Sequence, residues 1–342
     1  MAVTIKELSA YCGLSVSTVS KALNGYPDVS EETKEQVHAA AQKLGYRANA
    51  IARSLKIGRT FNIGVLYRDQ SGSGFTHSYF APILDAFRDE AERRGYDITF
   101  ITNSMGHSKM TFLEHCRYRN VDGVCIVCTA FDDPEVRELI ESDLPVVTVD
   151  DAFPGRVCVQ SENEAGVAAL VRHAISLGHR RIAFVRGEET SVTRIRLDVA
   201  RRTLAEAGLT LPDSYIVEGK YHHPAAAREA TMRLLALDPR PTCIMMTDDY
   251  AALGGLEAAQ AFGLHVPEDI SIAGYDGVPL IQLCKPRLTT VWQDTTTIGQ
   301  EAARQLVRLI EHPGDVKPGV IPVPCRLIRG DSMRQVAASD SE

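Results

Sequence analysis

The sequence predicts an α/β protein in which a small all-α headpiece precedes a two-lobed core of parallel sheets. Two observations predict this arrangement. The first 46 residues carry three short helical patterns, whereas from residue 61 short apolar runs alternate with helical patterns. These strand–helix units are too numerous for one small open sheet, so we expect two lobes with a cleft between them. The length of 342 residues fits two or three domains.

The headpiece pattern consists of helices that begin at capping residues and end at glycines. Thr4 and Glu7 have the spacing of a capping box, which predicts a first helix. Ser15 is the expected cap of a second helix over 16–24, and Ser30 of a third. Two short helices joined by a three-residue turn that contains Gly are typical of a helix-turn-helix motif.

A very short helical segment follows at 49–56. Helices of fewer than about a dozen residues are marginal in water, so this one is expected to need a partner. The basic Arg53 and Lys56 beside the apolar Leu55 indicate a DNA minor groove as that partner. An interdomain linker that happens to be helical is the alternative.

Charge is distributed unevenly along the chain. Residues 1–60 contain eight Lys and Arg against five Asp and Glu, a net charge of +3, and the remaining residues have a net charge of −10. A basic module on an acidic body indicates a polyanionic partner at one end of the molecule.

The core pattern alternates strands with helices. The expected strands are 62–67, 97–102, 123–128, 145–149, 181–185, 214–218, 242–246 and 270–275. Helical patterns at 79–94, 162–177 and 193–207 each stop at a glycine. Because parallel sheets bind ligands at the carboxyl ends of their strands, polar residues there are the candidate site.

Three headpiece motifs carry a family resemblance. The runs 4–8 (TIKEL), 16–24 (VSTVSKALN) and 50–56 (AIARSLK), in this order, resemble the lactose-repressor/galactose-repressor (LacI/GalR) family of bacterial regulators. Patterns at 120–123, 178–185, 267–276 and 288–291 extend the similarity over nearly the whole chain. The resemblance implies a core like that of periplasmic sugar-binding proteins, with two lobes crossed by three strands.

The resemblance also implies a domain map. Residues 1–48 are the expected helix-turn-helix DNA-binding domain, and residues 49–60 the hinge helix and linker. Residues 61–334 are the expected effector-binding and dimerisation core, and residues 335–342 a flexible tail. Within the core, lobe one is expected at about 61–160 and 291–320, and lobe two at about 161–290 and 321–330.

In that family the second helix lies in the major groove and the hinge inserts a leucine into the minor groove. The resemblance therefore implies that Val16, Ser17 and Lys21 contact the bases. A lysine can donate hydrogen bonds to guanine, and a valine can pack against the methyl group of thymine. The other expected DNA contacts are Thr4, Ser15, Thr18, Asn24, Asn49, Arg53, Leu55 and Lys56. Helix capping explains Thr4, Ser15 and Asn24 equally well, and a solvated surface charge is the alternative for Lys21.

The resemblance further implies a small-molecule effector between the lobes. Its expected contacts are Arg196, Asp248 and Asp276, followed by Tyr79, Phe80, Asp150, Thr193, Tyr221 and Gln293. An Arg fork with carboxylates suits a polyhydroxylated ligand, so a sugar or sugar derivative is favoured and a nucleobase is the alternative.

Several of these positions have a plainer interpretation. Asp276 precedes a glycine, as turn residues often do. Arg194 competes with Arg196 for the ligand, and residues 197–200 depart from the family pattern. Asp248 and Asp249 cannot both face the ligand, and Asp249 is the expected cap of the next helix.

Other signals are weak. Cys125 and Cys128 lie three apart on an expected strand, where such residues face opposite sides, so we interpret them as core. His222 is expected in a loop before a helix, and Trp292 is expected to pack. No catalytic or metal-ligating arrangement is predicted, so we expect neither a cofactor nor an enzyme.

Together these signals predict a repressor that binds a pseudo-palindromic, double-stranded operator as a homodimer under control of a sugar-like effector. No apolar run long enough for export or for a membrane is found, and the eight cysteines are scattered, so a cytoplasmic protein is expected. A solute-binding protein for sugar transport is disfavoured by the headpiece and by the missing signal peptide. An α/β enzyme is the third alternative.

Overall fold

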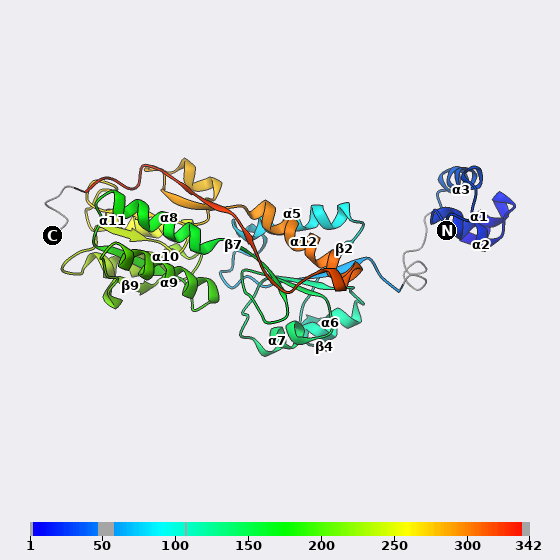
Figure 1. Ribbon diagram of the computed structural model, residues 1–342, viewed down its shortest axis with the longest axis horizontal. Coiled ribbons are helices and arrows are strands. Elements are labelled where there is room, and N and C mark those ends of the chain that lie inside the picture. The colour runs from blue at the N-terminus through cyan, green and yellow to red at the C-terminus, as the bar shows by residue number, and fades with distance from the viewer. Residues whose placement is uncertain (1–2, 47–57, 107, 337–342) are drawn as a thin grey trace. The chain divides into compact units, whose positions relative to one another are not determined.

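A computed structural model describes residues 3–46, 58–106 and 108–336. It confirms the α/β prediction and separates two compact units, Met1–Phe61 and Asn62–Glu342 (Figure 1). The predicted hinge contacts Asn49, Arg53, Leu55 and Lys56 lie outside the described residues. Among the described residues, no helix has both the length and the apolar character that a membrane span requires.

The first unit is built from the helices α1 (Ile5–Cys12), α2 (Val16–Leu23) and α3 (Glu31–Leu44). Each helix begins at a side-chain cap: Thr4, Ser15 and Ser30 accept the backbone N–H three residues later. The buried faces meet in one core, formed by Leu8, Val19, Ala22, Val29, Val37, Ala40 and Ala41.

Lobe one of the second unit is a six-stranded parallel sheet with the order β13-β7-β6-β5-β1-β2. Its strands are β1 (Asn62–Tyr67), β2 (Asp97–Phe100), β5 (Val124–Cys128), β6 (Val146–Val149), β7 (Val157–Ser161) and β13 (Gly319–Val323). The helices α5 (Phe80–Arg93) and α12 (Thr295–Glu311) pack together, and α6 (Phe112–Tyr118) packs with α7 (Pro134–Glu141). Short elements are η1 (Gly74–Thr76), β3 (Ser104–Met105), β4 (Ser108–Lys109) and η4 (Pro313–Asp315).

Lobe two is a four-stranded parallel sheet with the order β11-β10-β8-β9. Its strands are β8 (Ile182–Arg186), β9 (Ile216–Glu218), β10 (Cys243–Met245) and β11 (Ser271–Ala273). The helices α8 (Asn163–Ser176) and α9 (Ser191–Glu206) pack as one pair, and α10 (Pro224–Leu235) and α11 (Asp249–Ala261) as another. Each pair has its own core of buried apolar side chains. The short helices η2 (Asp213–Tyr215) and η3 (Pro279–Leu283) lie in connections.

The chain passes between the lobes three times. It leaves lobe one after β7, returns from β12 (Thr290–Gln293) into α12, and leaves again from β13 into β14 (Cys325–Ile328), which pairs antiparallel with β12 (Figure 1). Because β13 pairs with β7, the expected lobe boundary at residue 320 falls inside a strand of lobe one. The expected flexible tail is held at its start, since Val336 N–H donates to Leu177 O at 2.8 Å.

Candidate functional site

Strand ends of both lobes bring acidic residues to the cleft. Asp150 directly follows β6 of lobe one, and Asp276 follows β11 of lobe two. Both have positive φ angles, +67° and +101°, which non-glycine residues rarely adopt. Strained backbone of this kind costs free energy and tends to collect at ligand sites. Asp150 and Asp276, which the family resemblance implied as effector contacts, are two of six non-glycine residues with positive φ in the part of the chain that the structure describes.

Asp150 is paired with Tyr79. The Tyr79 hydroxyl donates to Asp150 Oδ2 at 3.0 Å, and the Tyr79 side chain is buried. Burial raises the pKa of Asp150 to about 6, against the lowering effects of the Tyr79 hydroxyl and of Arg196. Burial, then the charge of Asp150, raises the pKa of Tyr79 as well. The Asp150 carboxyl is thus an acceptor whose charge changes near neutral pH.

Asp276 is paired with Gln293 at the end of β12. Gln293 Nε2 donates to Asp276 Oδ1 at 2.7 Å. Gln293 is 2% exposed, and its Oε1 has no hydrogen-bond partner among the described residues. Burial, then the nearby Asp248, raises the pKa of Asp276 well above its usual range. The pair offers a buried acceptor that a ligand donor would satisfy.

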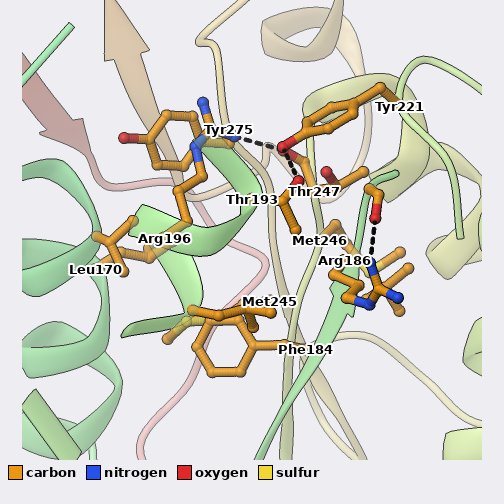
Figure 2. Close-up of a pocket in the computed structure, with 14 residues that line it drawn as sticks. Leu170, Phe184, Arg186, Thr193, Arg196, Tyr221, Met245, Met246, Thr247 and Tyr275 are labelled. Atoms are coloured by element: carbon orange, nitrogen blue, oxygen red, sulfur yellow. Dashed lines mark hydrogen bonds between the residues drawn. The ribbon is translucent and has the colours of Figure 1, made fainter. Parts of the chain in front are cut away.

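Arg196 on α9 lies in the cleft wall in a fixed orientation. Its Nε donates to Asn163 Oδ1 at 3.0 Å, and its Nη1 donates to Thr247 O at 2.9 Å. The guanidinium lies 3.6 Å from the centre of the Tyr275 ring (Figure 2). Arg194, the competing candidate, is exposed and pairs with Glu189. Of the two arginines, Arg196 therefore lies at the cleft.

Thr193 and Tyr221 form the rim beside Arg196. Thr193 Oγ1 lies 2.8 Å from the Tyr221 hydroxyl and donates to Glu188 O at 2.7 Å (Figure 2). A Cβ at Gly187 would lie 2.1 Å from Tyr221 Cε2, so the absence of a side chain there lets the ring lie against the end of β8. This close approach fixes the position of the Tyr221 ring.

The expected cap of α11 was assigned to the wrong aspartate. Asp248 is the N-cap, and its Oδ1 accepts from Ala251 N–H at 2.7 Å, whereas Asp249 is the first helical residue. The helix begins one residue earlier than the sequence indicated, which moves the cap back by one position. Asp248 Oδ2 also accepts from His222 N–H at 2.6 Å, so this carboxylate holds the loop before α10.

A stack of aromatic rings joins the two lobes, and no sequence pattern predicted it. His77 of lobe one lies 4.0 Å from His222 of lobe two, centre to centre, at an interplanar angle of 20°. His222 in turn lies 4.0 Å from the Tyr250 ring. Phe80 approaches this stack, since its ring centre is 4.8 Å from that of His77. A lone histidine in a loop carries no pattern that predicts such a pairing.

The headpiece places its expected base-reading residues on the surface. Val16 is 41% exposed and Ser17 is also exposed. Lys21 forms an ion pair with Asp28, which is not among the expected DNA contacts. Solvent and salt screen an exposed pair of this kind, so DNA can compete for the lysine.

The expected phosphate contacts have local roles. Thr4 and Ser15 are helix caps, and Thr18 Oγ1 lies 2.8 Å from Ser15 Oγ. Asn24 Nδ2 donates to Ser20 O at 2.6 Å. The capping interpretation thus holds for Thr4 and Ser15 at helix starts and for Asn24 at the end of α2.

Neither the cysteines nor Trp292 belong to a chemical site in the part of the chain that the structure describes. All eight cysteines are free; Cys125 is buried in β5 and Cys128 half-buried. Trp292 packs under Arg326, whose guanidinium lies 4.4 Å from the ring centre. Across the described ranges no cluster of three or more His, Cys, Asp or Glu is arranged to hold a metal ion.

Comparison with known proteins decides the family. Residues 4–49 match the model of bacterial regulatory proteins of the lacI family, and residues 171–333 match that of the periplasmic binding protein-like domain. The HTH-type transcriptional repressor PurR of Mannheimia succiniciproducens is 32% identical over 340 residues, which cover 98% of this chain and 99% of that protein. The chain belongs to the LacI family. It is therefore a transcriptional repressor of this family and not an enzyme.

Other LacI-family members are similar over nearly their full length. Catabolite control protein A of Priestia megaterium is 32% identical, with 96% of this chain and 98% of that protein covered. The structure of the lac repressor dimer bound to operator and the anti-inducer ONPF has a TM-score of 0.80 at 26% identity, covering 98% of this chain and 100% of that one. The complex of the transcriptional regulator CelR with cellobiose has a TM-score of 0.70 at 27% identity, covering 96% and 99%.

Proposed function

We propose that this repressor binds a pseudo-palindromic operator as a homodimer and that a sugar-like molecule in the cleft controls it. The observation that carries the proposal is the buried Gln293 Oε1 without a partner beside Asp276. An unsatisfied buried acceptor costs about 1–3 kcal/mol, and a ligand hydroxyl would remove that cost.

The polar groups around the cleft suit an uncharged ligand. Asp150 and Asp276 supply two carboxyl groups whose pKa values burial raises, beside the single guanidinium of Arg196. An anionic ligand such as a sugar phosphate would meet both carboxyls, whereas sugar hydroxyls can donate to the carboxyls and accept from the arginine. Asp248 supports this site through the His222 loop, and Thr193 and Tyr221 close its rim. The lac repressor and CelR structures were obtained with ONPF and cellobiose.

A nucleobase is the second candidate effector. The rings of Tyr79, Phe80 and Tyr221 supply flat faces, and the Asp276–Gln293 pair supplies neighbouring polar atoms of the kind that read a base edge. A thermal-shift screen that contains both sugars and nucleobases separates the two classes of effector.

The proposed DNA contacts lie in the three-helix headpiece and in the segment that follows it. Val16, Ser17 and Lys21 read bases, while Thr4, Ser15, Thr18 and Asn24 contact phosphates. We assign residues 1–48 to DNA binding, 49–60 to the hinge and 61–334 to effector binding and dimerisation. Asn49, Arg53, Leu55 and Lys56 form the minor-groove contacts, with Leu55 as the inserted side chain.

Control runs through the hinge segment. A segment of about two helical turns is marginal by itself, so its order depends on what holds its ends. Effector binding changes the arrangement of the lobes, and the paired hinges then order or melt. This couples two sites through one bistable element, and the coupling must be reciprocal.

A thermal-shift screen of the full chain tests the effector. A ligand that binds only the folded state raises the melting temperature, so the panel contains sugars, polyols, sugar phosphates and nucleobases. We expect stabilisation by an uncharged sugar or polyol, which then changes operator affinity in fluorescence anisotropy. Stabilisation by nucleobases or sugar phosphates alone would overturn the sugar assignment. Sedimentation of the operator complex should show two chains for each operator.

A hinge variant tests the DNA mechanism. Leu55→Ala should weaken operator binding while leaving effector affinity unchanged. The substitution removes the side chain proposed to insert into the minor groove and leaves the effector site intact. Unchanged operator affinity would defeat the proposed mechanism.

A further inference from the structure

A small apolar cavity adjoins the proposed effector site. It has a volume of about 40 Å³ and lies at the carboxyl ends of β8 and β10, beside α8 and α9. Its apolar walls are Val167, Leu170, Phe184, Leu197, Met245 and Met246 (Figure 2). Thr193, Arg196, Tyr221 and Tyr275 also line it, so the cavity shares part of its lining with the cleft wall.

Most of the polar groups that line the cavity already have a hydrogen-bond partner within the chain. Arg196 donates to Asn163 and Thr247, and Thr193 donates to Glu188 O. Arg186 donates to Gly187 O at 3.1 Å and to Glu218 at 2.7 Å. A water molecule needs only about 10–15 Å³, but it also needs two to four polar partners. The cavity is therefore large enough for water but offers it few partners. Its walls suit an apolar group.

We propose that the cavity receives a methyl group of the effector, which is then a deoxy sugar with CH₃ in place of one CH₂OH. This inference rests on the proposed sugar-binding function. The hydroxyls would meet Asp150, Asp276 and Gln293, while the methyl group passes Arg196 into the cavity. A hydroxyl group at the same position would lose its hydrogen bonds to water, and the apolar walls would offer no hydrogen bonds in their place. The thioether side chains of Met245 and Met246 can adjust around the methyl group.

Matched sugar pairs test this proposal by calorimetry on the full chain. The pairs are D-galactose with D-fucose, L-mannose with L-rhamnose, and D-glucose with 6-deoxy-D-glucose. In at least one pair the deoxy sugar should bind about tenfold tighter or more, the range that one methyl-sized group supplies in an apolar pocket. Equal or tighter binding of every parent sugar overturns the inference and leaves the proposed function standing. Binding of no sugar counts against both.

Cavity variants locate the effect. Val167→Leu fills the cavity and should remove the preference for the deoxy sugar. Val167→Ala should reduce the preference several-fold, while Val171→Ala removes the same two methyl groups one turn along α8 from a buried position away from the cavity. This control should keep the wild-type preference. The same deoxy-to-parent ratio in all three variants would contradict the proposal even if one of them folds poorly.

Discussion

At the residue scale, burial changes the charge state of the aspartates behind the cleft. Asp249 Oδ2 accepts from Val278 N–H at 2.8 Å, and its Oδ1 lies 2.7 Å from Thr290 Oγ1. Burial raises the pKa of Asp249 to about 8, although both of these hydrogen bonds lower it. Near neutral pH the carboxyl is therefore mostly protonated. Val278 N–H and the Thr290 hydroxyl both donate to this carboxyl group, and asparagine has the size and the neutral charge of its protonated form.

Asp249→Asn should flatten the pH dependence of stability. Because the folded pKa of about 8 lies well above the ordinary value of 3.8, the contribution of this group is fully present below pH 3.8. It is lost as the pH rises through 8, at up to about 1.4 kcal/mol per pH unit. The variant lacks this loss, so between pH 6 and 8 its free energy of unfolding should gain about 2 kcal/mol relative to wild type. Urea unfolding at several pH values measures this difference.

The exposed Asp198→Asn is the control for a change of one carboxylate and should follow the wild-type curve. Parallel pH curves for Asp249→Asn and wild type would show that Asp249 is already ionised when folded.

Arg196→Lys should abolish most effector binding. Lysine keeps the charge but has no planar fork, so it cannot hold Asn163 and Thr247 together while lying flat on Tyr275. Loss of one charged hydrogen bond costs about 1.5–3 kcal/mol, which corresponds to an affinity about tenfold weaker or more. Titration of the variant with the sugar that raises the melting temperature in the screen measures this loss of affinity. Arg194→Lys, two residues away on the same helix, should bind normally; equal loss in both variants would remove Arg196 from the site.

At the element scale, glycines set how closely helices approach. In α12, a Cβ at Gly299 would lie 2.2 Å from Ile83 O of α5. Gly299→Ala must therefore push α12 away from α5, and overpacking of this kind costs about 1–3 kcal/mol, more than the alanine gains in helix propensity. Denaturant unfolding should show a lower midpoint. Gly314→Ala, where the added Cβ meets nothing within 4 Å, should leave the midpoint unchanged.

Elements with local signals could be predicted from the sequence. The headpiece helices begin at Thr4, Ser15 and Ser30 as expected, because a cap and its helix lie within a few residues. Strand β7 was not predicted, although all five of its residues are buried. It is short, ends in Gln and Ser, and is defined by its pairing with β6 and β13, which local sequence does not encode.

The candidate site also contains residues that the sequence indicated and contacts that only the tertiary structure shows. The family resemblance implied Asp150 and Asp276 as effector contacts, and both follow apolar, strand-like runs of the sequence. The choice between Asp248 and Asp249 as the cap depended on a one-residue helix boundary, and the sequence led to the wrong one, Asp249. The stack of His77 on His222 joins residues of different lobes, so only the tertiary structure brings them together.

At the scale of the whole second unit, the two lobes are in direct contact. His77 and His222 stack across the cleft, and Ser191 Oγ donates to Asp150 O at 3.3 Å. Burial lowers the pKa of His77 to about 4 and lowers that of His222 too. Both rings are therefore neutral near pH 7, and no charge repulsion opposes the stack. These contacts contribute part of the free energy that holds the lobes together. Effector binding therefore has to contribute less of this free energy.

Removal of the stack should therefore weaken effector binding without any change to the polar cleft. Aromatic pairs contribute about 0.5–1.5 kcal/mol, so His77→Ala and His222→Ala should each weaken affinity by roughly two- to tenfold. The double variant should lose less than the sum of the single losses, because both remove one shared contact. His38→Ala, an exposed histidine of α3, is the control and should bind as wild type. Strictly additive losses would mean that the two rings act on the effector separately, and the stack would then not be what holds the lobes.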